Sequence, residues 1–239
     1  MKHRRRLARQ ALARLADEDD PDPDASAERK ESDEDRLEAP LRLNDVRMKT
    51  VVEMLRESGA RRVLDLGCGE GRLLRDLLRQ KQFLEIVGVD ASVRALEIAS
   101  ARLKLDRLAP RQRARIKLLH GALTYRDERL SGYDAAAAVE VIEHLDPGRL
   151  GAFERVLFEY ARPGVVVLTT PNREYNAKFT DLRAGAFRHG DHRFEWTRAE
   201  FATWAERVAS AHGYRVELAP VGEPDPSLGS PSQMGIFRR

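Results

Sequence analysis

The sequence predicts an α/β fold, in which a mostly parallel sheet carries helices on both faces. Short apolar runs typical of buried strands alternate with longer segments of helical spacing, which favours parallel strands joined by crossover helices. A glycine-rich segment, 67–71, follows the first of these runs, and Asp90 ends the second. The length of 239 residues is enough for one such domain and a short additional segment.

The expected elements begin with a helix over 44–56, where apolar side chains recur at helical spacing. Ser92 is a suitable N-cap for a later helix that runs to about residue 105. Thr197 and Glu200 form a capping box that opens the last helix. The other expected elements are a helix that begins over 71–78 and strands at 61–66, 85–89, 116–119, 135–139, 165–168, 214–218 and 232–237.

The N-terminal segment differs in composition from the rest of the chain. Residues 1–16 have the pattern of a basic amphipathic helix, and Asp, Glu, Pro and Ser dominate 17–38. The second stretch has too little apolar surface to order itself by burial. We therefore expect a charged, disordered tail or linker over 1–38, belonging to an N-terminal region that is missing here, and a single domain over 39–239.

Composition limits the class of protein only broadly. The formal net charge is +3 and the pI is about 9.1. Only seven of the 42 basic residues are lysines, and an arginine-rich chain is not by itself a sign of nucleic-acid binding. Cys68 is the single cysteine, which excludes an intrachain disulfide. No apolar run reaches the roughly 18 residues of a membrane span, and no signal sequence is present, so we expect a cytoplasmic protein without a membrane partner.

The glycine-rich segment 65–71 indicates a nucleoside-containing cofactor. Gly67 and Gly69 permit a tight turn and a close approach of the backbone to a ligand. The NAD fingerprint requires a third glycine where Arg72 stands, so the pattern is G-x-G-x-G. This pattern resembles motif I of the class I methyltransferases, which have a Rossmann-like fold and bind S-adenosylmethionine. Asp90 is placed to accept both ribose hydroxyls. The implied cofactor site consists of Asp65, Gly67, Gly69, Asp90 and Ala122, the last of these beside the adenine.

Three residues with potential metal ligands follow the expected strand 135–139. In a helical turn, Glu140, Glu143 and His144 share one face, at the sheet edge where ligands of open α/β sheets bind. The alternative is a solvated acidic helix start, which the helix dipole also favours. Two carboxylates suit Mg²⁺ or Mn²⁺ better than zinc. Residues 182–196 can supply a fourth ligand, and the residues alone leave His189, Asp191, His192 and Glu195 open.

Residues 41–239 resemble the 3′-terminal RNA ribose 2′-O-methyltransferases, the HUA-enhancer family of small-RNA methyltransferases, and most closely its bacterial RNA-repair type. The resemblance implies methyl transfer from S-adenosylmethionine to the 2′-hydroxyl of the 3′-terminal ribose of RNA, with a divalent metal that holds the 2′- and 3′-oxygens. It also implies that His192 is the fourth ligand and His189 only a loop histidine. The matching motifs are Leu43-Asn44-x-x-Arg47, Asp65–Gly71, Glu140-x-x-Glu143-His144, Thr170-Pro171-Asn172 with Glu174-Tyr175-Asn176, and Asp191-His192-Arg193-Phe194-Glu195-Trp196.

The resemblance further implies the partners. The substrate is RNA with a free 3′-terminal ribose, for which Arg47, Asn172 and Arg193 are candidate contacts. A polynucleotide kinase-phosphatase is a second expected partner, reached through the missing N-terminal region. Two alternatives stay open: an S-adenosylmethionine-dependent O-methyltransferase of small molecules, and a regulator that binds the cofactor without catalysis. The catalytic and metal-binding set of the main hypothesis is Glu140, Glu143, His144 and His192.

Overall fold

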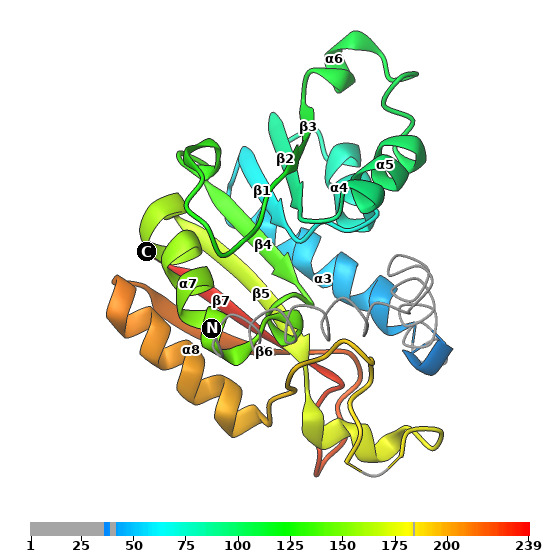
Figure 1. Ribbon diagram of the computed structural model, residues 1–239, viewed down its shortest axis with the longest axis vertical. Coiled ribbons are helices and arrows are strands. Elements are labelled where there is room, and N and C mark those ends of the chain that lie inside the picture. The colour runs from blue at the N-terminus through cyan, green and yellow to red at the C-terminus, as the bar shows by residue number, and fades with distance from the viewer. Residues whose placement is uncertain (1–35, 39–41, 184) are drawn as a thin grey trace, which may run out of the picture.

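The computed structural model describes residues 36–38, 42–183 and 185–239. The helix expected over 1–16 and most of the expected linker lie outside the described residues. Seven strands form one sheet in the order β3-β2-β1-β4-β5-β7-β6, and Figure 1 shows helices packed along it. The strands are β1 (Arg62–Leu66), β2 (Glu85–Asp90), β3 (Ile116–His120), β4 (Ala135–Val139), β5 (Val165–Pro171), β6 (Arg215–Val221) and β7 (Ser232–Arg238).

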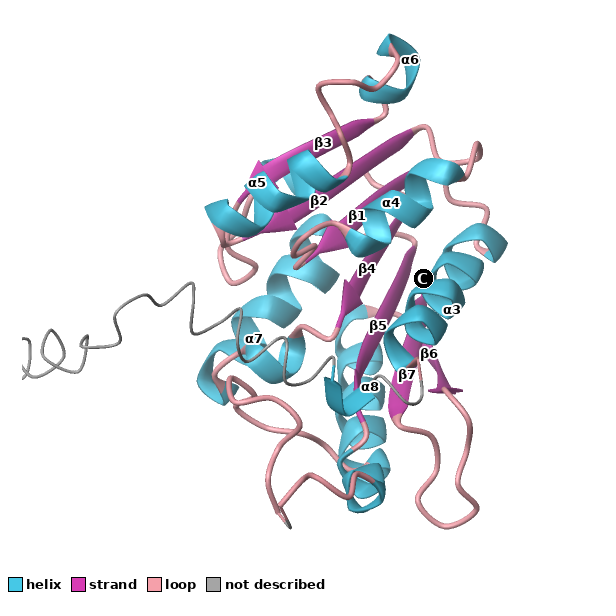
Figure 2. Cartoon of the chain, turned by 90° about the vertical axis from the view of Figure 1, so that its right-hand side faces the viewer, coloured by secondary structure: helices cyan, strands magenta, loops and turns pink. Residues whose placement is uncertain are grey.

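The helices form two layers, as Figure 2 shows. Alternate strand residues face opposite sides of the sheet. Val63 of β1 therefore packs with the apolar face of one helix layer, and its neighbour Leu64 packs with the other. The first layer consists of α3 (Leu43–Glu57), α4 (Arg72–Arg79) and α5 (Val93–Arg102), and the second contains α7 (Pro147–Glu154) and α8 (Arg198–His212).

The pairing of the strands places the site. Strand β1 pairs in parallel with β2 on one side and with β4 on the other. The chain therefore reverses its direction of winding between β1 and β4, and ligands of open α/β sheets bind at this point, beyond the carboxyl ends of the strands. Strand β7 runs antiparallel to both of its neighbours, β5 and β6. The predicted mostly parallel sheet with helices on both faces is confirmed.

Some local features differ from the expected pattern. Two short helices, α6 (Pro110–Arg113) and α7, and a π-helical turn over Arg155–Ala161 were not expected from the sequence. The turn after β4 is a 3₁₀ turn, η3, that contains only Ile142–His144. Glu140 precedes it with a left-handed backbone, φ 53°, so it does not share a regular helical face with Glu143 and His144.

The last helix begins as predicted. The Thr197 hydroxyl accepts a hydrogen bond from Glu200 N, and the Glu200 carboxylate accepts one from Thr197 N. Gly213, with φ 73°, ends this helix in the left-handed conformation that glycine adopts without strain. In the described ranges, no helix combines the length and the apolar character needed to cross a membrane.

Candidate active site

The loop between β1 and α4 requires glycine for two reasons. Gly67, Gly69 and Gly71 all have positive φ, which is 74° at Gly67. A Cβ at Gly67 would also stand 2.7 Å from Cγ2 of Val141, closer than two carbon atoms can approach. The loop therefore lies directly against the segment that follows β4. A larger residue at position 67 would push these two segments apart.

Asp90 is fixed by the same loop. Its Oδ2 accepts a hydrogen bond from Gly69 N at 2.8 Å, and its Oδ1 accepts one from Ser92 N at 2.8 Å. Each carboxylate oxygen has two lone pairs, so both retain acceptor capacity after these bonds. Asp90 thus stands at the carboxyl end of β2, held to receive hydroxyl donors from the adjoining cavity.

Asp65 is a buried carboxylate that faces the cavity. It is 2% exposed, and its Oδ2 has no hydrogen-bond partner among the described residues. Burial, together with the nearby charge of Asp90, raises the pKa of Asp65 to about 8. A buried carboxylate without a donor is costly, and a ligand ammonium group would remove that cost. The arrangement therefore suits an amino-acid moiety such as the methionine part of S-adenosylmethionine.

One cavity of about 600 Å³ joins the cofactor region to the expected metal region. This volume lies within the usual range for small-molecule sites. The glycine loop and Asp90 line one part of it, and His144 lines another. The lining residues that the sequence had singled out are Arg47, Asp65, Gly67, Gly69, Asp90, Ala122, Glu140, His144, His189 and Asp191. The glycine-loop motif and the Glu140–His144 motif are thus parts of a single site.

Three histidines meet at the second part of the site. One ring nitrogen from each of His144, His189 and His192 lies within 4.8 Å of the other two. The His144 and His192 ring centroids are 4.8 Å apart. Desolvation by the surrounding protein, followed by the neighbouring His192 and His189, lowers the pKa of His144. A neutral imidazole is the form that binds a metal.

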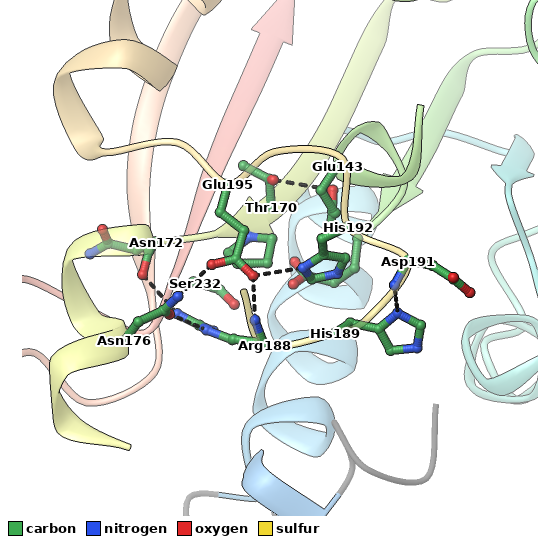
Figure 3. Close-up of polar contacts among 12 residues, drawn as sticks. Glu143, Thr170, Asn172, Asn176, Arg188, His189, Asp191, His192, Glu195 and Ser232 are labelled. Atoms are coloured by element: carbon green, nitrogen blue, oxygen red, sulfur yellow. Dashed lines mark hydrogen bonds and ion pairs between the residues drawn. The ribbon is translucent and has the colours of Figure 1, made fainter. Parts of the chain in front are cut away.

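His192 is oriented by a buried carboxylate, as Figure 3 shows. Its Nδ1 lies 2.6 Å from Oε1 of Glu195. The backbone N–H of Arg188 and the side-chain amide of Asn176 also donate to Glu195. Burial alone would raise the pKa of Glu195, but these hydrogen bonds outweigh it and lower the pKa. A carboxylate that fixes the Nδ1 side of a histidine directs its other nitrogen, which is the usual support of a metal-binding histidine.

The two glutamates of the motif have different surroundings. Glu143 is fully buried, and Thr170 Oγ1 donates to its Oε2 at 3.1 Å. Oε2 of Glu140 lies 3.1 Å from Nη2 of Arg47. Burial raises the pKa of Glu140, and the Arg47 guanidinium opposes that shift. Across the described ranges, neither carboxylate belongs to the compact group that the three histidines form.

The donor set fits a divalent cation. Neutral imidazoles and buried carboxylates are both ordinary ligands of Mn²⁺, and carboxylates are ligands of Mg²⁺. Glu140 and His144 line the cavity, the His192 ring lies against His144, and Figure 3 shows Glu143 near His192. His189, which the resemblance treats as a loop residue, lies in the histidine group as well.

The candidate substrate contacts are placed differently from one another. Arg47 lines the cavity but already pairs with carboxylates. Arg193 is more than half exposed, 3.7 Å from Asp146, which lines the cavity. Asn172 is 1% exposed, and its amide donates to the carbonyls of Leu228 and Ser230. Asn172 therefore secures the loop before β7, and it does not line the cavity.

Sequence reasoning missed the residues that support the ligands. Thr170 belongs to one of the matching motifs and Arg188 lies in 182–196, but the sequence predicted no supporting contact for either. Glu38 was assigned to the expected tail, yet it is 3% exposed and pairs with Arg47 and Arg188. Its acidic, proline-rich surroundings in the sequence contain no signal that separates it from its neighbours.

The fold and this site define a methyltransferase of the Rossmann-like class. The protein family described as "Methyltransferase domain" matches residues 1–209. The strand order, the G-x-G-x-G loop and the acidic residue at the end of β2 agree with that class.

The chain belongs more narrowly to the family of Hen1 methyltransferase domains. It is 54% identical to a crystal structure of the methyltransferase domain of bacterial CtHen1, with a TM-score of 0.77 over 82% of this chain and 100% of that one. A crystal structure of the small RNA methyltransferase HEN1 is 33% identical, with a TM-score of 0.75 over 82% of this chain and 25% of that one.

A curated relative, the small RNA 2′-O-methyltransferase of Rattus norvegicus, is 37% identical over 200 residues. The match covers 81% of this chain and 50% of the relative. The chain thus spans about half the length of the curated relatives it matches.

Proposed function

We propose that this chain methylates the 2′-hydroxyl of the 3′-terminal ribose of RNA, with S-adenosylmethionine as methyl donor and Mg²⁺ or Mn²⁺ as an essential ion. The observation that carries the proposal is the single cavity shared by the glycine loop and the histidine group. The names of the relatives, which are small RNA 2′-O-methyltransferases, support RNA as the substrate.

The cofactor is bound by residues of the first three strands. Asp65 would hold its ammonium group, Asp90 would hold the ribose hydroxyls, and Ala122 would line the adenine region, since all three line the cavity. Gly67 and Gly69 allow the backbone to approach the methionine part closely. When bound, the cofactor supplies a methyl group on a positively charged sulfur. The buried carboxylate of Asp65 becomes ionised once the ammonium group is its partner.

The ion would be held by residues after β4 and by the loop before α8. We assign Glu140, Glu143, His144 and His192 as its ligands, with Glu195 orienting His192. A bound divalent cation would lower the pKa of a ribose hydroxyl, which is otherwise a poor nucleophile at neutral pH. The lowered pKa of His144 keeps this ring neutral, as metal binding requires. Arg193, exposed at the rim, is suited to an RNA phosphate.

Matched RNAs that differ only at the terminal ribose test this function. The chain is incubated with labelled S-adenosylmethionine and Mn²⁺, and label is measured on RNAs with a 3′-hydroxyl, a terminal 2′-deoxyribose or a 3′-phosphate. We expect label only on the first, because the 2′-hydroxyl is the nucleophile and a phosphate adds bulk and charge beside it. Methylation at internal riboses, or of small diols and catechols instead of RNA, would refute the assignment.

We also propose an RNA-repair role in the cytoplasm beside a polynucleotide kinase-phosphatase. The support is the resemblance of 41–239 to the bacterial RNA-repair type. A kinase-phosphatase that converts 3′-phosphate ends into 3′-hydroxyl ends would make otherwise inert RNA a substrate. Addition of such an enzyme to the 3′-phosphate RNA above measures this, and absence of label despite complete removal of phosphate would contradict it.

A further inference from the structure

Glu38 joins two arginines that are far from it in sequence. Its carboxylate lies 3.1 Å from Nη2 of Arg47 and 3.3 Å from Nη1 of Arg188. All three residues are at most 4% exposed. Two guanidinium groups are costly to bury, and a carboxylate between them lowers that cost. Glu38 and Arg47 also line the cavity of the site.

Arg47 connects Glu38 to Glu140, the first residue of the expected metal site. The same nitrogen, Nη2, that contacts Glu38 also lies 3.1 Å from Oε2 of Glu140. This nitrogen carries only two hydrogens and donates in addition to Ser232 Oγ at 3.0 Å. The carboxylates of Glu38 and Glu140 therefore compete for one donor group. The charge of Glu38 reduces the share of that donor available to Glu140.

Arg188 connects Glu38 to His192, another expected metal ligand. Arg188 Nε donates to Asn176 Oδ1 at 2.7 Å, and the amide of Asn176 donates to Glu195. Glu195 in turn fixes Nδ1 of His192. In addition, the backbone N–H of Arg188 donates to Glu195 at 2.7 Å. Figure 3 shows Arg188, Asn176, Glu195 and His192 in one connected group.

We propose that Glu38 is a positioning residue for the metal site. Through Arg47 and Arg188, it fixes the positions of Glu140 and His192 relative to each other. The inference rests on the proposed function, in which Glu140 and His192 bind the ion. It adds a residue outside the recognised motifs, from the segment that precedes α3. Loss of its charge leaves Arg47 to pair more fully with Glu140, and Arg188 loses its carboxylate partner. Both changes weaken the binding of a divalent cation and leave the Asp65 and Asp90 region intact.

The test uses Glu38→Gln in the full chain and measures binding as well as turnover. Mn²⁺ alone is titrated by calorimetry, S-adenosylmethionine is titrated in EDTA, and the melting temperature is recorded. We expect Mn²⁺ affinity to fall by about tenfold, the usual effect of removing an outer partner of metal ligands. Cofactor affinity should stay unchanged. The matched control, Glu57→Gln, removes an exposed carboxylate of the same helix as Arg47 and should change neither affinity.

Glu38→Asp provides a second measurement, because it keeps the charge and retracts it by one methylene. Its Mn²⁺ affinity should lie between the wild type and Glu38→Gln, about threefold below the wild type. If Glu38→Gln does not fold, Glu38→Asp alone decides the matter, and wild-type affinity in it overturns the inference. Unchanged Mn²⁺ affinity in a folded Glu38→Gln overturns it too, while RNA methylation by the wild type would still stand. Failure of the wild type to bind Mn²⁺ removes both the metal assignment and this inference.

Discussion

The carboxylate of Glu195 lies 2.6 Å from Nδ1 of His192, and both side chains are fully buried. Such a contact fixes the ring orientation and leaves the opposite nitrogen to a ligand. The same carboxylate accepts hydrogen bonds from Arg188 and Asn176, so its position is set by three donors. The His192 ring thus has a defined direction before any ion arrives.

Replacement of Glu195 tests the importance of this contact. Glu195→Gln keeps the shape but loses the charge, so the Nδ1 side of His192 is held less firmly. We expect Mn²⁺ affinity or turnover to fall by about 10- to 100-fold, with unchanged affinity for S-adenosylmethionine. Calorimetry and a methyl-transfer assay measure the two effects. Glu206→Gln, an exposed change on α8, is the control and should be silent. A Glu195→Gln protein with wild-type values in both assays would show that His192 needs no such support.

Metal removal should separate cofactor binding from catalysis. The residues proposed to bind the cofactor, Asp65, Gly67 and Asp90, lie on β1, on the loop after it and on β2, while the proposed metal ligands come from later segments. In excess EDTA we expect S-adenosylmethionine to bind with its full affinity and turnover to vanish. Binding calorimetry in EDTA, alongside methylation before and after Mn²⁺ is restored, measures this. Full activity in EDTA would eliminate the metal-dependent mechanism.

In the absence of cofactor, Asp65 should lower the free energy of unfolding as the pH rises. Its pKa is raised from 3.8 to about 8 in the folded chain, so between these values the folded state keeps a proton that the unfolded state has lost. The resulting stability is fully present below about pH 4 and is lost as pH rises towards 8, a change on the order of a few kcal/mol. Asp65→Asn has no such proton to lose.

The melting temperatures of Asp65→Asn and the wild type therefore diverge with pH. We expect the variant to gain over the wild type between pH 4 and pH 8, when both are free of cofactor. Its affinity for S-adenosylmethionine should fall, because the carboxylate that pairs with the ammonium group is gone. A constant difference in melting temperature across this range would contradict the raised pKa, and undiminished affinity would contradict the assigned contact.

Gly67 should tolerate no side chain. Gly67→Ala places a Cβ 2.7 Å from Val141 Cγ2 and requires φ 74° of a residue for which that region costs roughly 1–2 kcal/mol. We expect a large loss of cofactor affinity. The double variant Gly67→Ala/Val141→Ala relieves the clash but not the backbone strain, so it should recover only part of the affinity. Complete recovery would mean that the contact alone sets the requirement for glycine.

The periodic and chemically distinctive parts of the sequence were predictable. Alternating apolar runs predicted the seven strands, and the Thr197–Glu200 capping box predicted the start of α8. The glycine loop and Asp90 lie together because they follow or end neighbouring parallel strands. The order of the two motifs along the sequence was enough to predict this. These features depend on local spacing, which is visible in a single sequence.

The supporting contacts depend on long-range packing and were not predictable. Arg188 lies 150 positions from Glu38, and no local pattern pairs them. The left-handed backbone of Glu140 could not be read from a residue type that rarely adopts it. The same holds for Asn172, which the resemblance made a candidate RNA contact but whose side-chain amide donates to loop carbonyls. Burial decides such roles, and burial is a property of the assembled fold.

The position of β7 in the sheet has a consequence for the synthesis of the protein. Residues 232–238 form the last strand of the described chain, but this strand lies between β5 and β6 and pairs with both. On the ribosome, β6 therefore has no neighbouring strand to pair with until β7 has also emerged. Nascent chains arrested before residue 232 should expose the unpaired edge of β5 and depend on chaperones. A stop codon in this region would remove an interior strand of the sheet, and with it the attachment of β6.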